Sequence, residues 1–270
     1  MKRAEQAVPL TANEPFFVGI DGRQLECAWF HPPQGSMPVP PLVMLHEGLG
    51  SVAMWKDFPA LLAASTGRRV LAYSRFGHGR SDPVRGHRDP MRVHETEALG
   101  VLSTLLDELE IERPVLFGHS DGASIALIHA GSSGRAVSGV IVLAPHVMVE
   151  PMCLQRIRAA RIAYESTDLK EKLGRYHAQP DAAFWGWNDL WLAPGFAAWN
   201  IEDHLRAISC PILAIQGYQD EYGTMEQLDR IAAAHPNASL LKLDNCAHSP
   251  HRDQPVAVLM ATSRFVQELH

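Results

Sequence analysis

The segment 118–122, which reads Gly-His-Ser-Asp-Gly, is the feature that most constrains how this 270-residue chain can fold. It follows the strand-like run 114–117 and precedes the helix-like run 123–127. So sharp a turn between a strand and a helix forces Ser120 into an unfavourable backbone conformation, and it leaves no room for side chains at positions 118 and 122. We therefore expect a strand, a tight turn and a helix, with the Ser120 hydroxyl raised clear of a sheet.

A serine, an aspartate and a histidine occur in that order, each of them after a strand-like run. Asp220 follows the apolar run 210–217, and His248 follows the run 239–243. A histidine can take the proton of a serine hydroxyl, and a carboxylate can orient that histidine and stabilise its charged form. We predict Ser120 as a nucleophile, His248 as its general base and Asp220 as the acid that supports the base.

Other acids and histidines compete for these roles. Glu221 lies next to the predicted acid, and Glu150 lies beyond the strand-like run at 137–144, from which a carboxylate could also reach the histidine. His46, His78 and His119 are possible second bases. We interpret His119 as structural, because an imidazole within a tight turn more often packs against neighbouring turns.

A second group of residues could bind developing negative charge. The strand-like run 41–45 ends in His-Glu-Gly, and Asp121 opens the helix after the serine turn, where unpaired amides and the helix dipole favour an anion. Acyl-group hydrolysis places negative charge on the former carbonyl oxygen, and two fixed N–H donors can stabilise it. We predict the amides of Gly48 and Asp121 as this oxyanion hole, with the carboxylates of Glu47 and Asp121 pointing away from it.

The order of apolar runs predicts an α/β fold with a mostly parallel, doubly covered sheet. Asp21 and Gly22 separate two strand-like runs, which is a strong hairpin signal. Further runs lack clean alternation, as expected for strands covered on both faces; they span 41–46, 69–74, 114–118, 137–144, 210–217 and 238–243. Helix-like stretches lie between them at about 54–65, 94–109, 121–131, 224–234 and 253–268.

The span 147–207 interrupts this alternation with helical and aromatic sequence. We interpret it as a helical cap inserted after the sixth strand, with residues 1–146 and 208–270 forming the core domain. Large aromatic faces above a serine suit apolar substrates, although they could equally hold the cap together. The residues predicted to contact a substrate are Glu47, His146, Trp185, Trp187 and Trp191. Arg158 and Arg161, near the start of the cap, could meet an anionic group.

Together these motifs resemble those of the α/β-hydrolases over nearly the whole chain. The resemblance is carried by residues 46–48, the turn at 75–82, the segment 118–122, Asp220 and His248. More narrowly, the chain resembles a group of bacterial Ser-His-Asp hydrolases of generic esterase type. It implies a nucleophile elbow, an oxyanion hole and a catalytic triad. The chain departs from the usual family pattern at Glu47, where a glycine is more common.

This resemblance implies a serine hydrolase that forms an acyl-enzyme with a carboxylic ester, lactone or thioester of a small molecule, which we expect to be apolar. No metal or organic cofactor is expected. Two alternatives stay open: hydrolysis of a carbon–carbon bond in a ring-fission product, and a ligand-binding receptor that keeps the triad but turns over slowly or not at all.

Composition narrows the possible partners. A formal net charge of −6 argues against nucleic-acid binding, and no run of the sequence predicts a signal peptide or a membrane span, so we expect a cytoplasmic enzyme. The four cysteines form no C-x-x-C pair, which argues against a zinc site or a disulfide framework. His248 and His251 have a possible metal-ligand spacing, but Pro250 interrupts the helix that would present them. We expect a small-molecule substrate and a monomer or homodimer.

Overall fold

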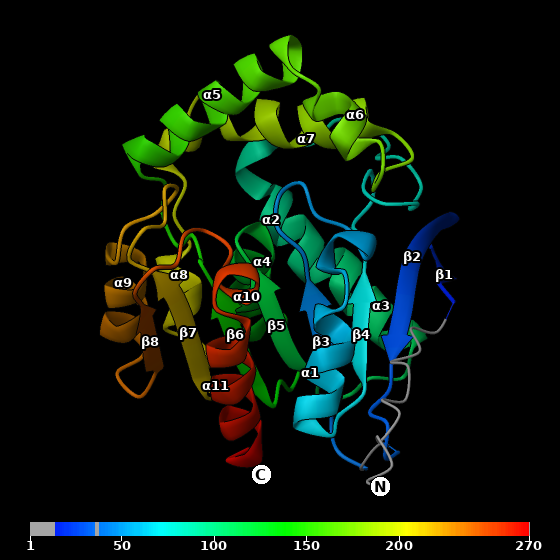
Figure 1. Ribbon diagram of the computed structural model, residues 1–270, viewed down its shortest axis with the longest axis vertical. Helices are drawn as coiled ribbons and strands as arrows, with labels where there is room; N and C mark the ends of the chain where they lie inside the picture. The colour runs from blue at the N-terminus through cyan, green and yellow to red at the C-terminus, as the bar shows by residue number, and fades with distance from the viewer. Residues whose placement is uncertain (1–13, 36–37, 270) are drawn as a thin grey trace, which may run out of the picture.

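A single eight-stranded sheet organises the protein, in a computed structural model that describes residues 14–35 and 38–269 (Figure 1). The spatial order is β1-β2-β4-β3-β5-β6-β7-β8. The strands are β1 (Phe16–Ile20), β2 (Arg23–Phe30), β3 (Leu42–Leu45), β4 (Val70–Tyr73), β5 (Val115–His119), β6 (Gly139–Leu143), β7 (Ile212–Gly217) and β8 (Ser239–Leu243).

Strand direction follows the patterns of the sequence. β1 and β2 form an antiparallel hairpin across Asp21 and Gly22, which both have positive φ, as a tight two-residue turn requires. β2 also pairs antiparallel with β4, whereas every other pair in the sheet is parallel. All residues of the parallel strands β3 to β7 are buried, because helices cover both faces. The predicted fold class is confirmed.

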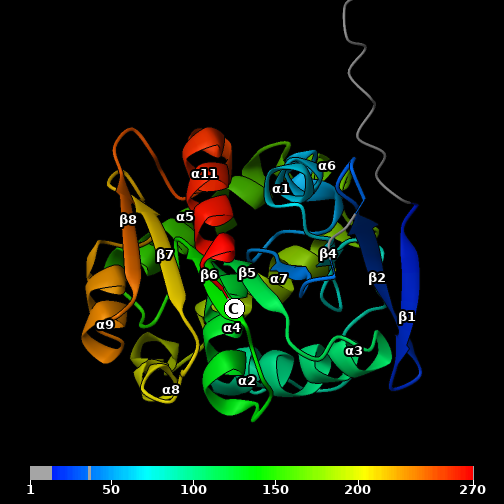
Figure 2. The ribbon, with the colours of Figure 1, turned by 90° about the horizontal axis from the view of Figure 1, so that it is seen from below.

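Helices cover the two faces of the sheet, as Figure 2 shows from below. On one face α1 (Phe58–Thr66) and α11 (Pro255–Gln267) pack against β-strand side chains such as Phe117. The helices that pack against the other face are α3 (Leu102–Glu108), α4 (Asp121–Ser132) and α9 (Glu226–Ala234). Each face therefore has its own apolar core, and the sheet is rigidly held between them. The short helices are α2 (Val93–Thr96), α8 (Glu202–Leu205) and α10 (Pro250–Asp253).

The chain between β6 and β7 forms three helices above the ends of the strands (Figure 1). These cap helices are α5 (Pro151–Ser166), α6 (Leu169–Leu173) and α7 (Pro180–Trp191). Both α5 and α7 begin with proline, whose fixed φ suits the first helical position. Within the described ranges, no helix combines the length and apolar character that crossing a bilayer requires.

The helix predicted over 94–109 is present as one continuous helical stretch over 93–108. A π-helical turn, Glu97–Val101, joins α2 to α3 within it. In this turn the buried Glu97 carboxylate accepts a hydrogen bond from the Tyr73 hydroxyl at 3.1 Å. Turns of this kind are rare and often lie at functional sites. Here the turn also lines a cavity next to the candidate site.

Candidate active site

Ser120 lies at the turn between β5 and α4 in a strained conformation, with φ of 53° and ψ of −118°. A Cβ atom at Gly118 would lie 2.3 Å from the carbonyl oxygen of Gly122, and one at Gly122 would lie 2.1 Å from that of Leu45. Glycine is therefore required at both positions. The serine conformation costs about 1–3 kcal/mol, and the packing of the strand and helix on either side holds the residue in it.

The fold brings Ser120, His248 and Asp220 into one hydrogen-bonded chain, although 128 positions separate the serine from the histidine. The distance from Ser120 Oγ to His248 Nε2 is 2.9 Å, and His248 Nδ1 lies 2.8 Å from Asp220 Oδ1. With the Nδ1 atom donating to the carboxylate, Nε2 is free to accept the serine proton. This arrangement can deprotonate a nucleophile and stabilise the imidazolium that results.

Three donors besides the histidine fix the Asp220 carboxylate. The amides of Tyr222 and Gly223 donate to Oδ1 at 2.9 and 3.3 Å, and Gln216 Nε2 donates to Oδ2 at 3.1 Å. Burial acts to raise the pKa of Asp220, but the hydrogen bond to His248 and the neighbouring charges outweigh it and lower the pKa. The group is ionised at neutral pH and has one fixed orientation.

The competing acids and histidines have other contacts. The Glu150 carboxylate accepts hydrogen bonds from Thr224 and from Gln227 Nε2, at 2.7 to 2.9 Å, and none from His248. Glu221 lines the cavity above the serine without a hydrogen bond among the described residues. His119 Nε2 donates to the carbonyl oxygen of His248 at 2.7 Å, so His119 supports the backbone of the neighbouring loop.

Three side chains hold the loop after β3 so that the Gly48 amide has a defined direction. The carbonyl oxygen of Glu47 accepts hydrogen bonds from Arg75 Nη2 at 2.9 Å and His46 Nδ1 at 2.7 Å. The carbonyl oxygen of Gly48 accepts one from His78 Nε2 at 2.9 Å. In a trans peptide the N–H points away from the C=O, so pinning the Glu47 carbonyl aims the Gly48 N–H the opposite way.

Within the described residues, neither the Gly48 N–H nor the Asp121 N–H donates to another protein group. Gly48 lines the same cavity as Ser120, and Asp121 is the first residue of α4, directly after the serine. Two free amides beside a nucleophile are the arrangement that an oxyanion needs.

The two carboxylates next to these amides have other contacts, and neither forms a hydrogen bond with Ser120 among the described residues. Asp121 Oδ1 accepts a hydrogen bond from Trp191 Nε1 at 3.1 Å and lies 3.4 Å from His94 Nε2. Burial would raise the pKa of Asp121, but His94 and Arg75 outweigh it and lower the pKa to about 2. The Glu47 carboxylate folds back over its own loop, where a Cβ at Gly50 would lie 2.0 Å from Oε2, and burial raises its pKa.

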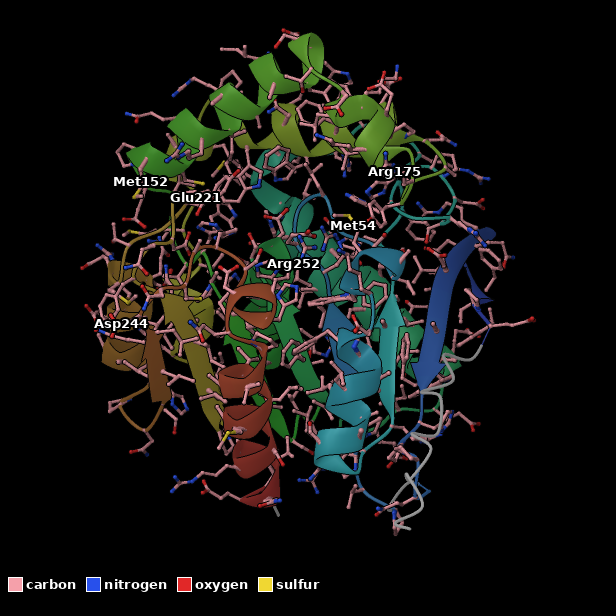
Figure 3. All side chains as sticks on the ribbon, viewed as in Figure 1. Met54, Met152, Arg175, Glu221, Asp244 and Arg252 are labelled. Atoms are coloured by element: carbon pink, nitrogen blue, oxygen red, sulfur yellow. The ribbon has the colours of Figure 1, made fainter. Side chains whose placement is uncertain are left out.

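A cavity of about 300 Å³ lies between Ser120 and the cap helices. Its cap wall is mainly apolar, with side chains from all three cap helices: Cys153, Ile157, Leu169, Leu173, Trp187 and Trp191. Figure 3 shows Met54 and Glu221, two further lining residues, in the band between the cap helices and the sheet. The cavity therefore fits a small, largely apolar group above the serine.

The residues predicted to contact a substrate divide into two groups. Glu47, Trp187, Trp191 and His146 line the cavity. Trp185 does not, because two positions along a helix turn the side chain by about 200°, which places it on the other face of α7 from Trp187. It packs with Tyr164 and Phe184 at ring distances of 5.6 and 5.1 Å, so it belongs to the core of the cap.

The cap arginines are also away from the cavity. Arg161 Nε donates to Asn188 at 2.8 Å, and its guanidinium pairs with Asp189, while Arg158 is exposed. Sequence reasoning missed Tyr222, whose ring centroid is 4.6 Å from that of His248, and the α5 pair Cys153 and Ile157. The four-residue spacing of that pair was an available signal, since it places both side chains on one helix face.

No metal site accompanies this arrangement in the described part of the chain. No group of three or more His, Cys, Asp or Glu side chains there could hold an ion. Cys27, Cys153, Cys210 and Cys246 are buried and free. Burial raises the pKa of each thiol, so all four are protonated at neutral pH.

The fold and this serine turn define an α/β hydrolytic enzyme, and comparison with known proteins gives the family. A model described as the alpha/beta hydrolase family matches residues 42–261, and the chain belongs to that family. Its curated relatives include the sn-1-specific diacylglycerol lipase ABHD11 of Danio rerio. The two are 24% identical over an alignment of 270 residues, which covers 84% of this chain and 78% of the lipase.

Solved structures show the same fold. The proline iminopeptidase of Mycobacterium smegmatis superposes with a TM-score of 0.75 at 18% identity, covering 94% of this chain and 98% of that one. The enol-lactonase of Burkholderia xenovorans LB400 has a TM-score of 0.71 at 19% identity, with coverages of 93% and 100%. The protein is a hydrolase with this widely shared architecture.

Proposed function

We propose that the protein is a serine hydrolase that cleaves a carboxylic ester, lactone or thioester of a small, largely apolar molecule through an acyl-enzyme. The observation that carries the proposal is the chain of hydrogen bonds from Ser120 Oγ through His248 to Asp220, at 2.9 and 2.8 Å. Its geometry meets the requirement that nucleophile and base lie within hydrogen-bond reach and that a third group orients the base.

The reaction then follows from the positions of these atoms. His248 Nε2 takes the proton of Ser120 as Oγ forms a bond to the substrate carbonyl carbon, and the Gly48 and Asp121 amides stabilise the oxyanion. The bond to the leaving group breaks as His248 returns the proton to it. Water next gives a proton to His248 and adds to the acyl carbon, and Ser120 leaves with that proton.

The cavity supports an apolar substrate class. Its cap wall presents aliphatic and indole surfaces, while the polar groups gather near Ser120 and His248. Burying apolar surface there would contribute roughly 25 cal/mol per Å² to binding. Relatives named as a lipase and an enol-lactonase act, by those names, on ester and lactone bonds, which supports the same bond class here.

We further propose that residues 147–207 act as a cap on a core of residues 1–146 and 208–270. The cap helices supply most of the apolar wall, whereas the strand ends supply the serine, the histidine and the acid. Substrate selection would therefore depend on the cap, and bond cleavage on the core.

Labelling and turnover test this function directly. The wild-type protein should react with a fluorophosphonate probe and hydrolyse 4-nitrophenyl acetate and butyrate. Ser120→Ala should lose labelling and turnover while keeping its far-ultraviolet circular dichroism spectrum. Ser103→Ala, a partly exposed serine of α3, is the matched control and should keep both activities. Turnover retained in Ser120→Ala would overturn the assignment.

A further inference from the structure

A second cavity, of about 270 Å³, adjoins the first. Gly48 and Trp187 line both cavities and form the boundary between them. A Cβ atom at Gly48 would lie 2.2 Å from the indole of Trp187, so the ring packs directly on the backbone of the loop. Of the two cavities, Arg75 lines only the second, and it donates a hydrogen bond to the carbonyl oxygen of Glu47. The Gly48 N–H belongs to the same peptide unit and points away from that carbonyl oxygen. The second cavity therefore adjoins the loop that carries the Gly48 amide.

Four arginines line this second cavity: Arg23, Arg75, Arg85 and Arg88. Among the described residues, no carboxylate lies within 4.0 Å of Arg75, Arg85 or Arg88. Arg75 is only 7% exposed. Its guanidinium donates to the carbonyls of His46 and Glu47, and Arg88 Nη2 donates to the carbonyl of Gly186 at 3.1 Å. Carbonyl partners satisfy these donors, but they leave the guanidinium groups without a carboxylate at ion-pair distance among the described residues.

The acids of this cavity have other close partners, and among the described residues none forms an ion pair with Arg75, Arg85 or Arg88, although the charge of Arg75 acts on both Asp121 and Glu97. Asp89 Oδ1 accepts from the Met91 amide at 3.0 Å, and Asp121 Oδ1 accepts from Trp191. Glu97 accepts from the Tyr73 hydroxyl, and burial raises its pKa even with arginines nearby. Arg75 is buried, Arg88 is half-buried and Arg85 is exposed. Their like charges line one cavity, so a bound anion would stabilise this cluster.

The remaining wall indicates which anion fits. Between the arginines lie apolar side chains, among them Phe76, Val84, Val93 and Leu190. A mixed wall of hydrocarbon and guanidinium suits a carboxylate on a short carbon chain, because the planar fork of arginine matches the two carboxylate oxygens. A Cβ atom at Gly186 would lie 2.9 Å from Arg88 Nη2, so the glycine of α7 makes the space in which this guanidinium reaches the cavity.

We propose that the second cavity binds a carboxylate group of the substrate, and that Arg88 and Arg85 recognise it while the scissile carbonyl lies at Ser120. The Trp187 ring would turn away from Gly48 to let the carbon chain between the two groups pass. This inference rests on the proposed hydrolase function and narrows its substrate class to esters, lactones or thioesters that carry a carboxylate at the end of a short apolar chain. Trp187 would contact such a substrate on both sides of the boundary.

Matched esters test the proposal. The substrates are the monomethyl and dimethyl esters of glutaric, adipic and pimelic acid, which differ in whether the far end carries a charge. In the wild type, kcat/KM for the monomethyl ester should exceed that for the dimethyl ester at one or more chain lengths. In Arg88→Gln this ratio should fall by about 10- to 100-fold, the usual effect of losing a charge-assisted hydrogen bond. Arg158→Gln, an exposed arginine of the cap, is the control and should leave the ratio within twofold.

A binding measurement keeps the test independent of turnover. Adipate should raise the melting temperature of Ser120→Ala but not that of the Ser120→Ala, Arg88→Gln double variant. If Arg88→Gln does not fold, the exposed Arg85→Gln replaces it in both measurements. Two results would overturn the carboxylate site. One is a ratio of kcat/KM for the monomethyl and dimethyl esters that Arg88→Gln leaves unchanged. The other is a larger rise in melting temperature with inorganic phosphate than with adipate. Absence of all ester turnover and of probe labelling would instead overturn the hydrolase function.

Discussion

Arg75 Nη2 donates to the carbonyl oxygen of Glu47 at 2.9 Å, on the far side of the peptide unit that carries the Gly48 N–H. Arg75 is therefore a positioning residue: it touches no reacting atom, yet it determines where one proposed oxyanion donor points. His46 Nδ1 supports the same carbonyl at 2.7 Å, so two donors from different elements oppose rotation of this peptide.

Replacing Arg75 with glutamine should loosen that peptide and lower kcat on 4-nitrophenyl acetate by about 10- to 100-fold with little change in KM. The expected loss is smaller than the roughly 10²- to 10³-fold that removal of an oxyanion donor causes, because His46 remains. Steady-state kinetics measure it, and Arg75→Lys should recover part of kcat.

Arg80→Gln is the matched control, because Arg80 is an exposed arginine of the same loop. A fall in melting temperature with an unchanged kcat in Arg75→Gln would show that the residue serves only stability. A rise in KM alone would also contradict the positioning role, because KM reports binding in the ground state.

Asp220→Asn should lower kcat by about 10⁴-fold, because an amide at this position favours the wrong tautomer of His248. The competing acid Glu150 accepts hydrogen bonds from Thr224 and Gln227 instead, so Glu150→Gln should change kcat less than threefold. Kinetics of the two variants at pH 7.5 compare the acids directly. A large loss in Glu150→Gln, with a small one in Asp220→Asn, would move the acid to the other loop.

Much of the fold could be predicted from the sequence, because its signals are local. Continuous apolar runs indicated the buried parallel strands, and the glycines at 118 and 122 indicated the turn at Ser120. Ser120, Asp220 and His248 follow β5, β7 and β8. This was also sufficient to predict that they meet, since the carboxyl ends of parallel strands share one edge of the sheet.

What could not be predicted depends on contacts between distant segments. Nothing near Arg75 in the sequence shows that its guanidinium reaches the carbonyls of His46 and Glu47, which lie 29 and 28 positions earlier in the chain. The π-helical turn at Glu97 depends on its contact with Tyr73 on β4. Trp185 could have been separated from Trp187 by helical periodicity, but only once the bounds of α7 were known.

Asp121 should stabilise the protein in a pH-dependent way. Its pKa is about 2 in the folded state against an ordinary 3.8, so the folded state holds the carboxylate ionised more strongly than the unfolded state does. The contribution, about 2 kcal/mol, is fully present above pH 4 and is lost as pH falls through 2. Urea unfolding of Asp121→Asn and wild type should therefore differ most at pH 7 and converge toward pH 2.

The exposed Asp57→Asn variant is the control for the change in charge. A difference between Asp121→Asn and wild type that stays constant from pH 7 to pH 2.5 would contradict the ionic role of the carboxylate. On a neutral ester, Asp121→Asn should keep kcat within tenfold, since its amide oxygen can still accept from Trp191.

Glu47 should have the opposite effect on stability. Burial raises its pKa, and Oε2 has no hydrogen-bond partner among the described residues, so ionisation disfavours the folded state. The folded state then binds more protons than the unfolded one above the ordinary pKa of 4.5, and its stability falls as pH rises. Glu47→Gln stays neutral, so its melting temperature should exceed that of wild type at pH 8, and the difference should narrow toward pH 4.

Scanning calorimetry from pH 4 to pH 8 measures this gap, with the exposed Glu165→Gln variant as the matched control. Activity distinguishes stability from chemistry in the same protein. Because the Glu47 carboxylate lies against Gly50 and forms no hydrogen bond with Ser120 or His248 among the described residues, Glu47→Gln should keep kcat on a neutral ester within tenfold. A lower melting temperature of Glu47→Gln at pH 8 would show that the ionised carboxylate stabilises the folded protein. A loss of kcat above about 100-fold would show that the carboxylate takes part in the reaction, which would contradict its proposed orientation away from the oxyanion.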